Sequence, residues 1–316
     1  MELRLPEWPI IDFHLHFPVP GGFLGGSRQR FIARFGQRKW DLLAKARSEY
    51  QEDWFLSWAI PRPEEASRTW EEQADRWRAE ADQYNLARVV FVTGGGNDQL
   101  AKIVARHPDR FLGFAHHDPF APDAAQELER AVTQLGLRGY KVFAPLLDRR
   151  LDDEAAFPVW EVAERHRLPV LIHFGILGGG WGTGNALNID PLVLHDVAKG
   201  FPEVPFVIPH FGTGYVRELL QLAWACRNVY VDSSGNNEWV RWMPYDLDIQ
   251  TLFRRFYETV GPERIIFGTD SSWFPRGFAI RYLLDQFRAC RQLRLPDEHL
   301  RLIFGGNAAR LLHLDS

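Results

Sequence analysis

The stretch PIIDFHLHF, residues 9–17, opens the series of apolar runs on which the architecture rests, yet it carries three polar side chains. Successive side chains of a strand point to opposite faces, so Asp12, His14 and His16 are expected to share one face with Ile10. Buried polar groups need hydrogen bonds, a metal ion or water. Two neighbouring imidazoles suit a metal ion, although a pair of hydrogen-bonded core histidines would give the same short pattern.

Seven further strand-like runs follow, separated by helical patterns. They are LARVVFVT (86–93), RFLGFAH (110–116), LRGYKVFA (137–144), LPVLIHFG (168–175), VPFVIPHFG (204–212), NVYVDSS (228–234) and RIIFGTDSS (264–272). Eight strands that alternate with helices predict an α/β protein whose parallel sheet closes into a (β/α)8 TIM barrel. An open doubly wound sheet is the alternative, but it requires a glycine-rich phosphate loop, which TGGGND (93–98) matches only weakly.

The polar, tryptophan-bearing segment after the first run predicts helices. We expect one barrel domain over residues 1–316, with a helical cap inserted after the first strand at about residues 22–84. Within this insertion Trp54 and Trp58 are four residues apart and therefore lie on one helical face. Packing of that face against the barrel is the simpler interpretation, and a hydrophobic lid or a dimer contact is the alternative. The sequence leaves a homodimer open.

Composition narrows the class of protein. The formal net charge is −4, without a basic excess, so we expect no nucleic-acid partner. No apolar run reaches the ~18 residues of a membrane span, and the start MELRLPEWPI lacks the features of a secretory signal. Only two cysteines, Cys226 and Cys290, are present, which fits a reducing compartment. We therefore expect a cytoplasmic protein that acts on a small molecule.

Polar residues recur at the ends of other predicted strands. In barrels of this type the active site is built at the C-terminal ends of the strands. Lys141, His173, His210, Asp232 and Asp270 each occur late in an otherwise apolar run. Alone, each could be a hydrogen-bonded core residue or part of a turn. Polar residues placed by chance, however, would not concentrate at the ends of strands. Together with the first-strand histidines they predict one site at the mouth of the barrel.

These residues and the sequence around them resemble the amidohydrolase superfamily of metal-dependent (β/α)8 enzymes. The similarity is to the amidohydrolase-related (amidohydrolase 2) branch, which includes 2-amino-3-carboxymuconate semialdehyde decarboxylase and γ-resorcylate decarboxylase. It runs from about Pro9 to Leu314, apart from the insertion near residues 22–70. Matching stretches are NDQLAKIVARHPDRFLGFAHHDP, LVLHDVAKGFPEVPFVIPHFG, RNVYVDSSG, RIIFGTDS and GGNAARLLHL.

The resemblance implies a ligand set for a metal ion. His14, His16, His173 and Asp270 would bind one divalent metal, most often zinc in this branch. Three imidazoles and a carboxylate are good zinc ligands and leave a position for water or substrate. His210 would lie near the metal as a general acid or base, and Asp270 could also transfer a proton.

Lys141 admits two interpretations. In binuclear members of the superfamily a lysine at this position is carboxylated and bridges two metal ions, which would allow a second metal here. In a mononuclear site the lysine would instead pair with a carboxylate such as Asp270 or contact the substrate. The branch that the chain resembles favours the single metal ion.

Substrate specificity is expected from the loops that follow the strands. Arg276 and Arg217 are the guanidinium groups nearest the expected mouth and would bind an acidic substrate, unless they only form surface ion pairs. Trp273 and Trp181 fall in the same loops and would give an apolar wall that accepts a ring.

Two reactions share this machinery. In hydrolysis, which we expect first because Lys141 keeps the binuclear route open, metal-activated water attacks a lactone, amide or similar carbonyl of a small acidic or cyclic substrate. In non-oxidative decarboxylation of an aromatic or unsaturated carboxylic acid, an acid protonates the carbon that loses carbon dioxide. A barrel that only binds a ligand would be expected to lack one of these positions, and none is lacking.

Overall fold

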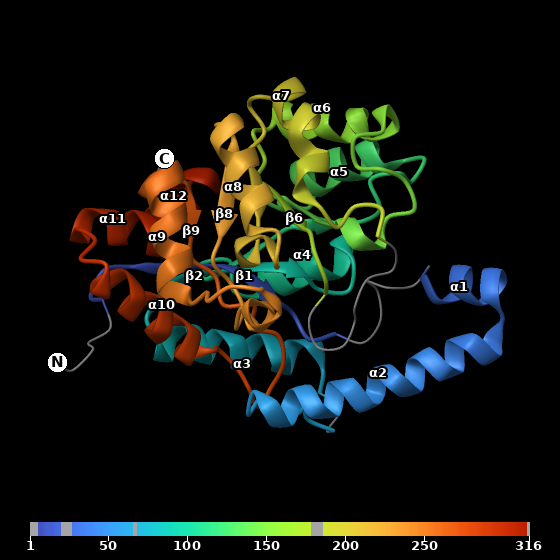
Figure 1. Ribbon diagram of the computed structural model, residues 1–316, viewed down its shortest axis with the longest axis horizontal. Helices are drawn as coiled ribbons and strands as arrows, with labels where there is room; N and C mark the ends of the chain where they lie inside the picture. The colour runs from blue at the N-terminus through green and yellow to red at the C-terminus, as the bar shows by residue number, and fades with distance from the viewer. Residues whose placement is uncertain (1–5, 20–26, 66–67, 178–185, 315–316) are drawn as a thin grey trace.

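The computed structural model describes residues 6–19, 27–65, 68–177 and 186–314. Within these ranges short strands, all paired in parallel, form the frame, and helices surround it (Figure 1). The strands are β1 (Ile10–His16), β2 (Leu86–Thr93), β3 (Phe111–Gly113), β4 (Ala115–His116), β5 (Tyr140–Phe143), β6 (Val170–His173), β7 (Phe206–Ile208), β8 (Val229–Asp232) and β9 (Ile265–Ile266).

The strands follow one another around a barrel in chain order. β1, β2 and β3 form one ladder, and β4 to β9 form a second. β3 and β4 are two parts of one extended segment, and the N–H of Phe114 between them donates to the carbonyl of Phe91 in β2 (3.0 Å). At the other seam the N–H of Phe13 donates to the carbonyl of Phe267 (3.1 Å) and joins the last strand to the first. The predicted (β/α)8 barrel is confirmed.

Helices alternate with the strands, and most of them bury an apolar face against the barrel. For example, α9 buries Leu252, Phe253, Phe256 and Val260. The helices are α1 (Ser27–Phe35), α2 (Gln37–Ser57), α3 (Trp70–Gln83), α4 (Asn97–Arg106), α5 (Ala124–Thr133), α6 (Phe157–Arg165), α7 (His195–Gly200), α8 (Val216–Ala225), α9 (Ile249–Val260), α10 (Ile280–Gln292), α11 (Asp297–Arg301) and α12 (Asn307–Leu311). No helix in the described ranges is long and apolar enough to span a bilayer.

Apolar side chains fill the inside of the barrel. An inner cluster takes Phe13, Val90, Leu171, Val207 and Ile266 from five different strands, and α12 packs against it. A larger outer cluster lies between the strands and the surrounding helices. The polar residues of the predicted site come later in the same strands, so they lie beyond the inner cluster, at the C-terminal end of the barrel.

Strand β1 does not keep the simple alternation expected from its sequence. Ile11 and Phe13 belong to the inner cluster, whereas Leu15 belongs to the outer cluster. The expectation that Asp12 shares a face with His14 and His16 is therefore wrong, because the same alternation would put Phe13 and Leu15 on one face. The register of β1 against β2 shifts between Asp12 and Leu15, which is the mark of a β-bulge. The extra residue reverses which side chains of β1 point toward the inside of the barrel, just before the site residues.

Asp12 is separated from the two histidines by this bulge. Its carboxylate accepts hydrogen bonds from the backbone N–H of His14 (3.1 Å) and of Thr269 (3.0 Å), and from the hydroxyl of Thr269. The side chain is fully buried. Asp12 therefore satisfies backbone donors that the bulge and the barrel seam leave without strand partners.

Three helices lie between β1 and β2, where the insertion is expected. α3 packs against the barrel, with the buried ring of Trp77 centred 5.9 Å from that of Phe91 in β2. α2 runs along the edge of the molecule and carries α1 at its far end (Figure 1). α3 thus takes the place of the first barrel helix, and α1 with α2 form the additional part. A single domain with a cap at residues 22–84 stays a prediction.

Candidate metal centre

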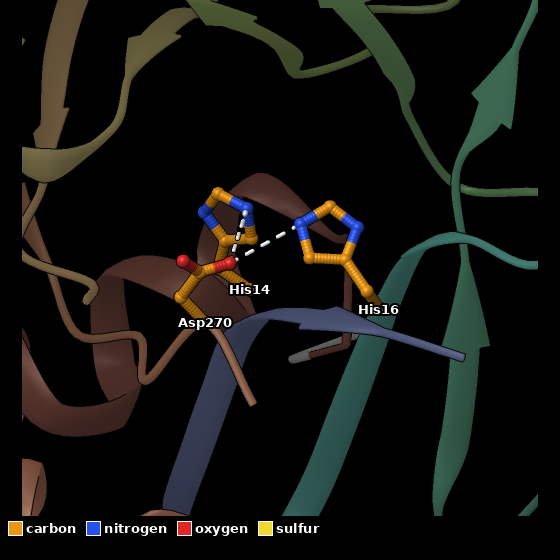
Figure 2. Close-up of side chains that lie close together, drawn as sticks. All are labelled: His14, His16 and Asp270. Atoms are coloured by element: carbon orange, nitrogen blue, oxygen red, sulfur yellow. Dashed lines mark ion pairs between the residues drawn. The ribbon is translucent and has the colours of Figure 1, made fainter. Parts of the chain in front are cut away.

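Three of the predicted ligands come together where β1 meets the segment after β9 (Figure 2). One ligand atom each of His14, His16 and Asp270 lies within 4.8 Å of the others. Asp270 Oδ1 is 3.2 Å from Nε2 of His16 and 3.8 Å from Nε2 of His14. The backbone connects the same residues, because the N–H of Asp270 donates to the carbonyl of His14 (2.8 Å). The junction between the first and last strands of the barrel therefore brings these three residues together.

The ring of His14 is held so that Nε2 is left for a ligand. Nδ1 lies 2.7 Å from Oδ2 of Asp232 in β8 and 3.0 Å from the hydroxyl oxygen of Ser234. A carboxylate accepts, so Nδ1 carries the proton and Nε2 the lone pair. Nε2 is buried and has no hydrogen-bond partner among the described residues. Burial, followed by the charge of Lys141, holds the pKa of His14 well below its usual value, so the ring is neutral, as a metal ligand must be.

His16 is oriented by a second residue behind it. Its Nδ1 lies 2.7 Å from the hydroxyl oxygen of Thr93, the last residue of β2. Groups that fix the second nitrogen of a histidine in this way are typical of metal sites. Asp232 was expected at the site as a strand-end residue, whereas Thr93 and Ser234 were not identified. Thr93 carries the same signal, a polar residue at the end of an apolar strand.

Asp270 follows its strand in an unusual backbone conformation. Its φ is 59°, and His210, which follows β7, has a φ of 56°. Non-glycine residues seldom adopt this left-handed conformation, and such residues concentrate at functional sites. Burial raises the pKa of Asp270, but the hydrogen bond from His16 and the electrostatic effect of His210 outweigh burial and bring the pKa well below its usual value. The side chain is 34% exposed, so the cluster can be reached from solvent.

His210 and His173 lie beside the cluster. The ring of His210 is centred 5.1 Å from that of His14 and 5.0 Å from that of His173. Nδ1 of His210 lies 3.0 Å from the carbonyl oxygen of Ser234, which fixes the proton on Nδ1 and leaves Nε2 to exchange protons. His173 is not among the three grouped ligands, and its Nε2 lies 3.4 Å from the carbonyl oxygen of Ile176. Its place in the ligand set stays a prediction.

Lys141 is buried at the same end of the barrel. Its Nζ makes no hydrogen bond within the part of the chain that the structure describes, and lies 4.5 Å from the centre of the Phe143 ring. That ring in turn stacks on His173, with centroids 5.9 Å apart. Burial lowers the pKa of Lys141 to about 7, against the attraction of Asp270 and Asp232. The amine therefore exchanges its proton near neutral pH.

The match to a family decides the classification of the chain. The amidohydrolase family model matches residues 11–314, nearly the whole sequence. The chain belongs to the amidohydrolase family. The resemblance expected from the sequence is thereby confirmed, and with it the barrel, because the family members compared below share that fold.

Two relatives of this chain are decarboxylases by name. Gamma-resorcylate decarboxylase of Polaromonas sp. is 27% identical over 218 residues, which cover 55% of this chain and 64% of the relative. 2-Amino-3-carboxymuconate-6-semialdehyde decarboxylase of Dictyostelium discoideum is 31% identical over 98 residues, which cover 31% of this chain and 26% of the relative. The matched stretch spans less than two thirds of either relative. Both relatives fall within the expected class, hydrolase or decarboxylase.

A solved structure shares the fold of this chain over nearly its full length. 5-Carboxyvanillate decarboxylase of Novosphingobium aromaticivorans superposes with a TM-score of 0.62 and 17% identity, over 97% of this chain and 96% of that protein. At this identity the likeness concerns the fold alone. That structure contains manganese and 4-hydroxy-3-methoxy-5-nitrobenzoic acid.

The residues predicted to bind substrate lie in different places. Arg276 is half-buried beside Asp270, and its Nη1 donates to the carbonyl of Asp270 (3.3 Å). Its guanidinium lies 5.3 Å from the ring centre of Trp273. Arg217 in α8 is 80% exposed and pairs with its neighbour Glu218, as a surface residue would. Trp181 lies outside the described residues.

Proposed function

We propose that this protein is a metal-dependent decarboxylase that releases carbon dioxide, without an oxidant, from an aromatic or unsaturated carboxylic acid. The observation that carries the proposal is the activity named for both relatives, which match 55% and 31% of the chain. The hydrolysis expected first from the sequence has no such support. Both reactions use the same histidines and carboxylate, so those residues alone do not separate them.

His14, His16 and Asp270 would hold the divalent metal, with His173 as the further ligand predicted from the sequence. The fit rests on the donors themselves, which include neutral imidazole nitrogens and an ionised carboxylate. The buried, unpaired Nε2 of His14 supports it, since an orphaned acceptor costs ~1–3 kcal/mol. When bound, the metal would orient and polarise the carboxylate or a hydroxyl group of the substrate as a Lewis acid. We propose zinc, with manganese as the alternative, because the 5-carboxyvanillate decarboxylase structure contains manganese.

His210 is the proposed proton donor. Its Nδ1 is fixed by the carbonyl of Ser234, so Nε2 is the nitrogen that can take up and release a proton. In the proposed step the bond between the carboxyl carbon and its neighbour breaks, carbon dioxide leaves, and the neighbouring carbon takes one proton from His210. Solvent then returns a proton to His210. Asp270, which solvent can reach, is the second residue that could carry a proton.

The surroundings suit an acidic ring. Arg276 beside Asp270 would pair with an anionic substituent, and Trp273 would contact the ring. Lys141 supplies a buried amine without a hydrogen-bond partner in the described residues, which would contact the carboxylate of the substrate. A carboxylated Lys141 that bridges two metal ions is the alternative role, and counting metal ions in a Lys141→Ala variant separates the two.

The proposal is tested by incubating zinc- or manganese-loaded protein with a panel of hydroxylated benzoates that includes 2,6-dihydroxybenzoate and 5-carboxyvanillate, and measuring carbon dioxide release. We expect turnover of at least one acid, and a loss of about 100-fold or more in His210→Asn, because general acids contribute roughly 10²–10⁴-fold. His195→Asn, at a partly exposed position in α7, is the matched control and should keep full activity. Hydrolysis of lactones by a protein that decarboxylates none of the acids would contradict the proposal.

A further inference from the structure

A glycine-rich loop connects β2 to α4 beside the candidate metal centre. It is the stretch TGGGND (93–98), which matches a phosphate-binding loop only weakly. Gly95 and Gly96 have φ values of 82° and 96°, in the left-handed region that glycine adopts most readily. The chain therefore turns back sharply here, and the backbone N–H groups of Gly94 and Gly96 reach the same acceptor atom.

That acceptor belongs to the ring of His116 in β4. Nδ1 of this ring lies 3.2 Å from the carbonyl oxygen of Phe114, so Nδ1 carries the proton and Nε2 the lone pair. Nε2 accepts from the N–H of Gly96 (3.0 Å) and, at a longer distance, from that of Gly94 (3.4 Å). Burial of the ring lowers the pKa of His116 to about 4, so at neutral pH the ring keeps this lone pair. The N–H groups of the loop are thus bonded within the protein, where a phosphate loop would present them to a ligand.

The backbone of His116 is bonded to the same loop. Its N–H donates to Oδ1 of Asn97, the first residue of α4 (2.9 Å). Nδ2 of Asn97 donates in turn to Oε1 of Glu127 in α5 (2.6 Å). His116 and Asn97 are both buried, so their hydrogen bonds are shielded from water. His116 therefore fixes the loop from Gly94 to Asn97 through its ring and through its backbone.

The loop begins at Thr93, the residue that orients the predicted metal ligand His16. The hydroxyl oxygen of Thr93 lies 2.7 Å from Nδ1 of His16. The carbonyl of Thr93 accepts from the N–H of Phe17 (2.9 Å), so Thr93 contacts the end of β1 twice. Because Gly94 follows Thr93 directly, a shift of Gly94 would also displace these two contacts.

We propose that His116 is a positioning residue for the metal centre, which acts on His16 through the glycine loop and Thr93. The inference rests on the metal site of the proposed function and is independent of the reaction that takes place there. Without the acceptor at His116, the N–H groups of Gly94 and Gly96 would lose their partner, and the loop would have to move to find another. His16 would then be held less firmly in the orientation that metal binding needs.

The inference is tested by measuring the zinc affinity of the full chain in competition with a chromophoric chelator. His116→Leu removes the acceptor and should weaken zinc binding by about tenfold or more. His116→Gln can place Oε1 near the position of Nε2 and should keep most of the wild-type affinity. Circular dichroism checks folding. His116→Asn, whose side chain is too short to reach the glycines, replaces His116→Leu if that variant does not fold.

Asn228→Ala is the matched control for a general loss of stability. Nδ2 of Asn228, just before β8, donates to the carbonyls of Ala198, Phe201 and Val204, at the end of the barrel opposite the site. Its removal should lower the stability to urea and leave the zinc affinity unchanged. A loss of zinc affinity equal to that of His116→Leu would overturn the inference, because the effect would then come from stability alone.

A double variant tests the route from His116 to the metal ligand. Thr93→Val removes the hydroxyl that orients His16 and should itself weaken zinc binding. If His116 acts through Thr93, adding His116→Leu to Thr93→Val should weaken binding little further. Fully additive effects, or an unchanged affinity in His116→Leu, would contradict the inference. A wild-type protein that binds no zinc would instead overturn the metal site of the proposed function, so the two failures are distinguishable.

Discussion

At the scale of single residues, the candidate metal centre depends on groups that do not themselves face the metal. Asp232 accepts from Nδ1 of His14 at 2.7 Å, and this bond both fixes the ring and keeps the lone pair on Nε2. The sequence could indicate Asp232, because it ends an apolar strand. It could not indicate which histidine Asp232 contacts, because the two residues are 218 positions apart and only the closed barrel brings them together.

We predict that Asp232→Asn lowers the affinity for zinc by about 10–100-fold while the fold is kept. The neutral amide of asparagine would hold the Nδ1–H of His14 less strongly than the charged carboxylate does. Competition with a chromophoric chelator measures the affinity. Asp297→Asn, on the surface in α11, should leave it unchanged. An unchanged affinity in Asp232→Asn would mean that His14 is positioned by Ser234 alone.

At the scale of the elements, apolar runs locate strands well but do not give their register. The run 86–93 coincides with β2, and most of the other predicted runs contain a shorter strand at their centre. The bulge in β1 was not predictable, because a bulge arises from pairing with a neighbour and leaves no mark in a single alternating run. His14 and His16 both follow the bulge, so the two side chains still come together with Asp270.

Gly268, between β9 and Asp270, shows how closely the elements approach at the site. A Cβ at this position would lie 2.9 Å from Cβ of His14 and 2.9 Å from Oδ1 of Asp232. We predict that Gly268→Ala destabilises the protein by about 1–3 kcal/mol, as overpacking does, and weakens metal binding. Urea unfolding measures the stability. Gly200→Ala, where a Cβ meets nothing within 4 Å, is the control, and equal effects of the two substitutions would refute the explanation.

At the scale of the whole molecule, the barrel was predictable because alternating strands and helices leave few other arrangements. The reaction was not, because hydrolysis and decarboxylation need the same polar groups at the same strand ends.

The stability of the whole protein should carry a pH dependence that originates at Lys141. Burial lowers the pKa of its amine from 10.5 to about 7. Below pH 7 the amine is protonated in both the folded and the unfolded protein, so burial of the charge lowers the free energy of unfolding by its full amount. Between pH 7 and 10.5 the unfolded chain binds more protons, so the free energy of unfolding rises with pH by roughly 1 kcal/mol per unit.

We therefore predict that Lys141→Met is more stable than wild-type protein at pH 6, and that the difference shrinks as the pH approaches 10. Urea unfolding of both proteins with a chelator present measures it, since the chelator removes any contribution from bound metal. Lys199→Met, at an exposed position in α7, should differ from wild-type protein by the same amount at every pH. A pH-independent difference for Lys141→Met would mean that the amine keeps its charge in the folded protein.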